Sequence, residues 1–105
     1  MDERERRVVA NEVVSRTVNE ELAPLQVEDV LALLCECGRP NCHATISVSR
    51  NEYEQVRSQP TRFLVKSGHE IPEVETTVSA SGAHVVIEKD AVLARQLAQQ
   101  HNPRT

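Results

Sequence analysis

The three cysteines of this chain lie within eight residues, in the segment CECGRPNC. Their spacing is Cys35-x-Cys37-x4-Cys42, and an odd number of cysteines cannot be paired completely in disulfides. No apolar run near Met1 resembles a signal peptide, so we expect a cytoplasmic protein, in which clustered cysteines favour a metal over disulfides. The cluster therefore predicts a metal-binding knuckle, by which we mean the segment from Cys35 to Cys42.

The composition supports this prediction. Hydrophobic residues make up 39% of the 105 residues, and Tyr53 and Phe63 are the only aromatic side chains. Aromatic residues bury the largest area per side chain, so a core of Val, Leu, Ile and Ala is expected to be thin. Small domains with thin cores usually need a disulfide, a metal or a partner chain for stability.

The residues around the cysteines favour a sharp reversal of the chain. At the end of a strand, the first two cysteines would point to one face and Glu36 to the other, because strand side chains alternate. Gly38 permits a positive φ directly afterwards, and Pro40-Asn41 favours a turn. We expect the backbone to fold back so that the third cysteine meets the first two.

Structural zinc takes four ligands in a tetrahedron, so three cysteines leave one position open. His43 adjoins Cys42 too closely to share an ion with it, His84 falls in an expected hairpin strand, and His101 lies near the end of the sequence. His69 follows a strand expected over 63–66, and pairing of that strand with 45–48 would bring it beside the knuckle.

We therefore predict that zinc (Zn2+) is bound by Cys35, Cys37, Cys42 and His69. A carboxylate remains an alternative fourth ligand, and His69 could instead be a turn histidine bonded to backbone. Unliganded or redox-active cysteines, another metal and an iron–sulfur centre also remain open for the cluster.

The rest of the sequence predicts an α+β fold, with an N-terminal helix, a small zinc-stapled antiparallel β unit containing a short helix, and a C-terminal helix. Helices are expected over 3–22, 50–58 and 91–101, the second capped by Ser49 in a capping box with Glu52 and the third by Asp90. Strands are expected over 31–37, 45–48 and 63–66, followed by a hairpin of 73–79 and 83–88 around the loop 80–82. We divide the chain into an N-terminal amphipathic helix (1–25), a zinc-binding domain (26–90) and a C-terminal helix and tail (91–105).

An apolar stripe runs along the N-terminal helix through Val14, Val18, Leu22 and Leu25, and it is widened by Val9 and Val13. The simplest expectation is that this stripe packs on the chain's own sheet. The alternative is a partner surface, on which the helix pairs with a second copy or docks on another protein.

Other classes of partner are disfavoured. The net charge is −4 and no segment is basic, which argues against nucleic-acid binding without excluding it. No apolar run is long enough to cross a bilayer, and no small-molecule substrate is evident.

No enzyme signature stands out, so we expect a protein that is not an enzyme. Glu70, Glu73 and Glu75 could be paired carboxylates for acid–base chemistry. Alternation on an exposed strand explains Glu73 and Glu75 more simply as a solvated face. Three glycines form no phosphate-binding loop, and no Ser, His and Asp arrangement is visible.

The segment over about 33–90 resembles a family of small uncharacterised bacterial proteins, mainly actinobacterial, with a Cys-x-Cys-x4-Cys and a Gly-His-Glu motif. The matching positions are Cys35, Cys37, Cys42, Ile46, Tyr53, Glu54, Val56, Arg57, Pro60, Phe63, Val65, Gly68, His69 and Glu70. Leu34 departs from the more aromatic approach to the first cysteine that the family pattern implies. The resemblance implies that His69 is the fourth ligand, and it implies no activity.

These observations predict a small cytoplasmic structural-zinc protein that acts as a protein-interaction or regulatory module, for example as a transcription accessory factor. The alternatives are a nucleic-acid-binding regulator and a thiol-based redox or metal sensor.

Overall fold

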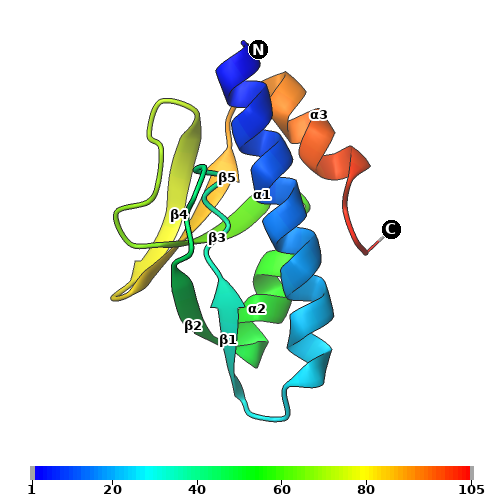
Figure 1. Ribbon diagram of the computed structural model, residues 1–105, viewed down its shortest axis with the longest axis vertical. Coiled ribbons are helices and arrows are strands. Elements are labelled where there is room, and N and C mark those ends of the chain that lie inside the picture. Colours follow the sequence, from blue (N-terminus) through cyan, green and yellow to red (C-terminus); the bar gives the residue numbers. More distant parts are fainter. Residues whose placement is uncertain (1, 105) are drawn as a thin grey trace.

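The computed structural model describes residues 2–104, and it has the predicted α+β architecture with a helix at each end (Figure 1). Its elements are helix α1 (Glu3–Leu22), the short 3-10 helix η1 (Ala23–Leu25), strands β1 (Val30–Leu34) and β2 (Thr45–Ser49), helix α2 (Arg50–Arg57), strands β3 (Arg62–Lys66), β4 (Glu75–Ser81) and β5 (His84–Lys89), and helix α3 (Val92–Gln100). Across residues 2–104, no helix combines the length and the apolar character that crossing a bilayer requires.

The five strands form two antiparallel sheets. Strands β1 and β2 pair with each other, and the second sheet has the order β3-β5-β4. The predicted pairing of 45–48 with 63–66 is therefore wrong. The predicted strand 31–37 is also too long, because it ends at Leu34, where the chain begins to cross from one sheet to the other.

Backbone hydrogen bonds show how this crossing is made. The Cys35 N–H still donates to the Ala44 carbonyl, 3.0 Å away, which continues the first sheet. The Glu36 N–H donates instead to the Leu64 carbonyl of β3, at 2.8 Å. Neighbouring residues of one short segment thus join the two sheets.

Two apolar clusters fill the interior. One lies between the first sheet, α2 and η1, and its buried members include Leu31, Leu33, Ile46, Val48, Tyr53 and Val56. The other surrounds the knuckle, and it consists of Cys35, Cys37, Phe63, Val65, Val85, Ile87 and Ala98. The first two cysteines are therefore part of the core rather than of a surface loop.

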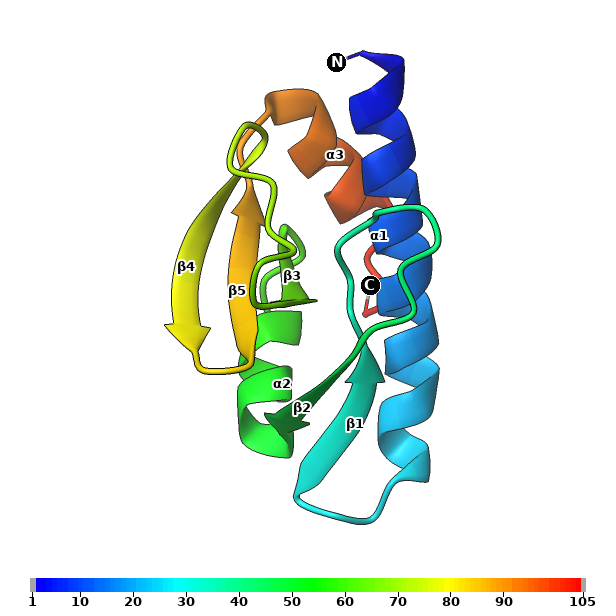
Figure 2. The same cartoon turned by 60° about the vertical axis from the view of Figure 1, so that its left-hand side comes forward.

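Helix α1 runs along the length of the molecule, and the two views show both sheets on one side of it (Figures 1 and 2). Its buried residues are Val9, Glu12, Arg16 and Asn19. The stripe predicted to pack on the sheet is only partly buried: Val14 and Leu25 are 62% and 78% exposed. Val13, Val18 and Leu22 are half-buried, and Val9 is buried. The helix does pack on its own domain, but through a mainly polar face.

Arg16 shows why a polar face can be buried here. Its guanidinium donates to the carbonyls of Pro60, Ala98 and His101, at 2.6, 2.8 and 3.1 Å. Buried polar groups are tolerated when they are hydrogen-bonded. Hydrophobic periodicity could not reveal this, because it counts only apolar side chains.

Local sequence signals predicted some boundaries correctly and others not. Ser49 caps α2 as predicted, accepting a hydrogen bond from the Glu52 N–H at 3.1 Å. The prediction that Asp90 caps α3 is wrong, because its carboxylate accepts from the Thr76 hydroxyl at 2.7 Å and Ala91 precedes the helix. The predicted hairpin is present, but its turn is the two residues between Ser81 and His84, where Gly82 has a φ of 65°.

Two side-chain amides cover the outer edge of β1. The Gln26 amide accepts from the Ala32 N–H at 2.9 Å and donates to the Ala32 carbonyl at 3.0 Å. The Asn19 amide makes the same pair with Leu34, at 2.9 and 3.0 Å. These amides supply the hydrogen bonds that a neighbouring strand would otherwise make.

Candidate metal centre

The knuckle reverses the chain directly after β1. Gly38 and Asn41 both have positive φ, at 75° and 64°, and the Cys42 N–H donates to the Arg39 carbonyl at 3.3 Å. Glycine and asparagine are the residues that adopt this left-handed conformation most readily. The reversal therefore follows from the sequence, and it returns Cys42 to the first two cysteines.

His69 reaches the knuckle from the turn that follows β3. The turn is closed by the His69 N–H, which donates to the Lys66 carbonyl at 2.9 Å. Arg39 of the knuckle donates to the backbone carbonyls of His69 and Glu70, at 3.4 and 3.3 Å. The turn arrives here because the Cys35–Glu36 segment docks on the edge of β3, and not through the strand pairing we predicted.

The ligand atoms of Cys35, Cys37, Cys42 and His69 all lie within 4.8 Å of one another. The His69 Nδ1 is 3.6 Å from the Cys35 Sγ and 3.6 Å from the Cys42 Sγ. A tetrahedral zinc with ordinary Zn–S and Zn–N bonds separates a sulfur from a nitrogen by about 3.6 Å. Three sulfurs and one imidazole at these separations could hold a metal ion.

Electrostatics among the thiols also favour a cation. The hydrogen bond that the first two cysteines share raises the pKa of Cys35, which burial raises further, and it lowers the pKa of Cys37. Adjacent thiols therefore resist carrying negative charge together. A divalent cation would stabilise the thiolates together, because thiolates are the ligand form of cysteine.

A backbone donor supports the first sulfur. The Lys66 N–H points at the Cys35 Sγ, 3.1 Å away. Hydrogen bonds of this kind orient metal ligands and stabilise their charge. Cys35 and Cys37 are buried, whereas Cys42 and His69 are partly exposed, so the group faces solvent on one side only.

The other histidines lie elsewhere. His43 is exposed, and His101 lines a groove between α1 and α3. His84 has Ser81 and Glu52 as neighbours, but both contact the same ring nitrogen, Nε2, at 3.2 and 2.8 Å. A serine–histidine–carboxylate relay needs its two partners on different ring nitrogens, so this trio is not one.

Sequence reasoning missed the role of Glu36, which anchors the knuckle on the face opposite the cysteine sulfurs. The Glu36 carboxylate is fully buried and accepts four hydrogen bonds. Two come from Arg57, at 2.8 and 3.0 Å, one from the Asn19 amide at 2.7 Å, and one from the Leu64 N–H at 2.9 Å. We call Glu36, Arg57, Asn19 and Leu64 the Glu36 cluster. Alternation placed Glu36 opposite the cysteines, but nothing in the sequence identified Arg57 as its partner.

Glu75 does not lie where its sequence pattern suggested. We expected it on a solvated face, yet only 4% of it is exposed. Its carboxylate lies 3.0 Å from the Lys89 Nζ, which is also 3.0 Å from the Glu12 carboxylate. Lys89 lies on the neighbouring strand, so the ion pair that permits this burial depends on strand register.

Comparisons with family models, with curated proteins and with solved structures found no match. The family resemblance noted in the sequence therefore stays a prediction.

Proposed function

We propose that this protein is a structural-zinc domain that works as a protein-interaction or regulatory module. One observation carries the metal assignment: three cysteine sulfurs and one imidazole nitrogen lie within 4.8 Å of one another. Cysteine and histidine together are the usual ligands of structural zinc, whereas calcium and magnesium prefer oxygen. Iron–sulfur clusters usually take four thiolates, and this chain has three cysteines.

A structural role fits better than a catalytic one. Four protein ligands complete the tetrahedron, so no position is left for a substrate or an activated water. The ion would tie the knuckle after β1 to the turn after β3, and so would join the two sheets. Such binding contributes directly to folding free energy, on the order of 10 kcal/mol in zinc-finger peptides.

The knuckle also contacts helix α1, so the ion would act beyond the loops. The Asn11 amide donates to the Gly38 carbonyl at 3.1 Å, and a Cβ at Gly38 would lie 2.4 Å from the Val8 carbonyl oxygen. Figure 2 shows the loop between β1 and β2 lying against α1. A metal that fixes the knuckle would fix this helix as well.

Exposed apolar side chains support the interaction role. Val14 of α1, Leu25 of η1, Val27 of the next loop and Val30 at the start of β1 are each more than half exposed. Single exposed apolar residues are ordinary, but several within residues 14–30 favour a binding surface.

The metal assignment can be tested on the purified protein. We expect about one zinc per chain by mass spectrometry of the metal content, and loss of the circular dichroism signal of the folded protein after chelation. His69→Ala should lose zinc, whereas His43→Ala, which removes an exposed imidazole next to the knuckle, should keep it. A metal-free preparation that stays fully folded would refute the proposal.

Partial exposure of Cys42 favours one second candidate, a peroxide-responsive site. Hydrogen peroxide would take two electrons from two thiolates, forming one disulfide and two hydroxide ions and releasing the zinc. Zinc release by mild peroxide that a thiol reductant reverses would support this role. Retention of zinc under the same treatment would leave the site purely structural.

A further inference from the structure

The outer face of α1 carries a regular repeat. Arg7, Ala10, Val14, Thr17 and Glu21 are all exposed and follow one another at spacings of three and four residues. Such spacing places side chains on one side of a helix, and it is the spacing of helix-pairing seams. This face lies opposite the buried polar face of the helix, and its central residue, Val14, is 62% exposed.

Charges at the two ends of this outer face are opposite. Arg7 precedes Val14 by seven residues and Glu21 follows it by seven. Within residues 2–104, neither Arg7 nor Glu21 takes part in an ion pair. In an antiparallel two-fold pair centred on Val14, each Arg7 would therefore face the Glu21 of the other copy.

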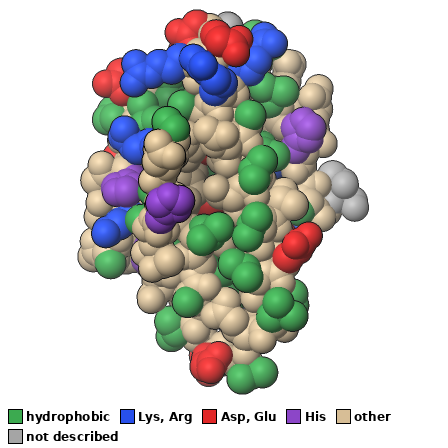
Figure 3. Space-filling model, in the orientation of Figure 1, with side chains coloured by type: hydrophobic (Ala, Val, Ile, Leu, Met, Phe, Trp, Pro, Cys, Tyr) green, Lys and Arg blue, Asp and Glu red, His purple; other side chains and the backbone are tan. Residues whose placement is uncertain are grey.

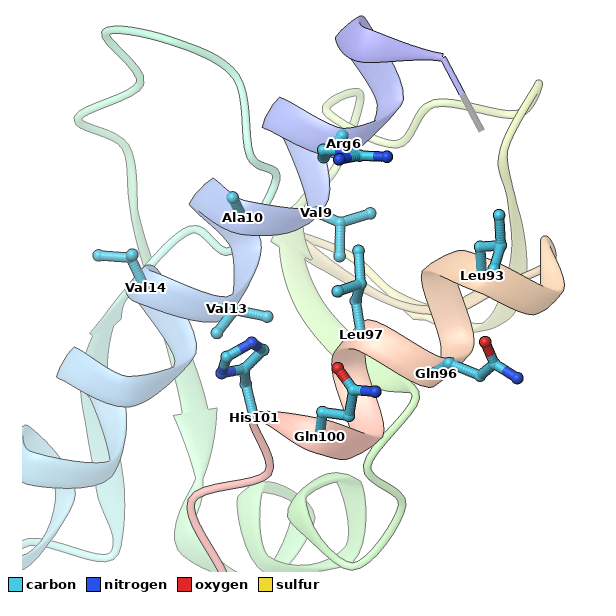
Figure 4. Close-up of a pocket in the computed structure, with 10 residues that line it drawn as sticks. All are labelled: Arg6, Val9, Ala10, Val13, Val14, Leu93, Gln96, Leu97, Gln100 and His101. Atoms are coloured by element: carbon cyan, nitrogen blue, oxygen red, sulfur yellow. The ribbon is translucent and has the colours of Figure 1, made fainter.

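A groove of about 570 Å³ runs beside this face, between α1 and α3 (Figure 4). Its apolar walls include Val9 and Val13 of α1 and Leu93 and Leu97 of α3. Leu93 is 50% exposed. A groove of this size can accept apolar side chains from a neighbouring helix.

The antiparallel arrangement also supplies side chains for the groove. When Val14 lies on the two-fold axis, the end of α1 in one copy lies beside the first turns of α1 in the other. Leu25, which is 78% exposed, would then lie near the end of the groove formed by Arg6 and Leu93. Figure 3 shows hydrophobic side chains distributed over this face and Lys and Arg side chains gathered at the end where the chain starts.

We infer that α1 is a homodimerisation helix, which packs antiparallel on α1 of a second copy through its outer face and the adjoining groove. This inference rests on the proposed interaction role and does not depend on the metal. A second copy satisfies both charges at once, because each is matched by its opposite in the other chain. A uniformly acidic partner helix would face Glu21 with a like charge, and a uniformly basic one would face Arg7 with a like charge.

Charge reversal tests the arrangement directly. We expect wild-type protein to dimerise reversibly in sedimentation equilibrium. Arg7→Glu and Glu21→Arg should each weaken the dimer by about tenfold or more, because each replaces two attractions by two repulsions. An equimolar mixture of these two variants should associate again, since every facing pair in the mixed dimer is then attractive. Glu73→Arg makes the same charge change as Glu21→Arg at an exposed position before β4, away from α1, and should leave dimerisation unchanged.

A second measurement does not depend on charge. Val14→Cys should form a disulfide-linked dimer under mild oxidation, because the two copies of this residue meet at the axis. Thr17→Cys should not, because its two copies would be separated by about 9 Å along the helices. Each variant is first checked for circular dichroism and zinc content, which report on the metal proposal separately.

A wild-type protein that stays monomeric at all accessible concentrations would overturn the inference, even if it binds zinc. So would a dimer that neither reversal weakens, or one that the mixture of the two variants fails to restore. Dimerisation of a metal-free but folded protein would uphold the inference while refuting the zinc proposal.

Discussion

The segment Cys35–Glu36–Cys37 is held from its two faces in different ways. On one face, two sulfurs join Cys42 and His69 in a group that is partly open to solvent and suited to a metal ion. On the other face, the Glu36 carboxylate is buried and receives four hydrogen bonds from the protein itself. The first face has side chains that could hold an ion from outside the chain, whereas every hydrogen bond of the second face comes from the chain itself.

The two faces should therefore contribute differently. A buried ion pair gains little net stability, because desolvation offsets much of its attraction, but breaking it is costly. Metal binding adds a large favourable free energy. We interpret the Glu36 cluster as fixing where the Cys35–Cys37 segment docks on the second sheet. The metal group would then stabilise the docked arrangement. The following variants test that division.

The largest effect is expected from Arg57→Met. This change leaves the Glu36 carboxylate buried without its main partner, and removing one member of a buried pair typically costs about 3–5 kcal/mol. The variant should still bind one zinc wherever it is folded, because no ligand is changed. Urea unfolding at saturating zinc measures the free energy of unfolding.

Arg62→Met is the matched control. Arg62 lies 3.7 Å from Glu88 in a pair whose side chains are 33% and 27% exposed, so its loss should cost at most about 1 kcal/mol. Equal losses in the two variants would contradict the distinction between a buried cluster and an ordinary surface pair.

Gly38→Ala should have the next largest effect. The new Cβ would lie 2.4 Å from the Val8 carbonyl oxygen and 2.8 Å from the Glu12 Cγ, in a residue with a φ of 75°. Overpacking and the left-handed backbone together should cost about 2–4 kcal/mol in thermal or urea unfolding.

Gly82→Ala separates the two causes. Gly82 also has a positive φ, of 65°, but a Cβ added there would have nothing within 4 Å, so about 1–2 kcal/mol is expected. If Gly38→Ala costs no more than Gly82→Ala, close packing of the knuckle on α1 is not what requires glycine there.

A pH-dependent effect is expected from Glu12, which belongs to neither face. Burial raises the pKa of Glu12 from 4.5 to about 8, against the opposing effect of Lys89. Between these values the folded chain binds more protons than the unfolded chain, so the free energy of unfolding should fall as pH rises. The contribution is at most about 1.4 kcal/mol per pH unit.

Glu12→Gln should remove that slope and leave the variant relatively more stable at the upper end of the range. Urea unfolding of both proteins between about pH 6 and about pH 8, at fixed zinc, measures the difference. Glu28→Gln, at an exposed position, should behave like wild type. Parallel pH profiles for Glu12→Gln and wild type would show that Glu12 does not titrate in this range.

Much of the fold was predictable from local signals. Helix boundaries, the Ser49 cap, the hairpin and the return of Cys42 to the first two cysteines follow from spacing, turn residues and capping chemistry. His69 was chosen as the histidine best able to complete a metal site, and it arrives by a route that we did not predict. These features depend on residues close in sequence or on the few side chains that can bind a metal.

What could not be predicted depends on long-range contacts of polar and charged side chains. The apolar stripe of α1 matched the buried face only in part, because Glu12, Arg16 and Asn19 are buried with partners between 15 and 85 residues away. Glu75 looked solvated because its partner Lys89 is identified only by the register of two strands. The same limit hid the bond between Glu36 and Arg57, and with it the reason the two sheets meet where they do.

The amides of Gln26 and Asn19 on the edge of β1 have a consequence for aggregation. By occupying the N–H and carbonyl groups of Ala32 and Leu34, they prevent a foreign strand from extending this sheet. Strand β4 lies at the edge of the other sheet, and its residues from Thr76 to Ser81 are all exposed and uncharged. Fibril growth from this protein, under conditions that loosen it, should therefore begin at β4 and spare β1.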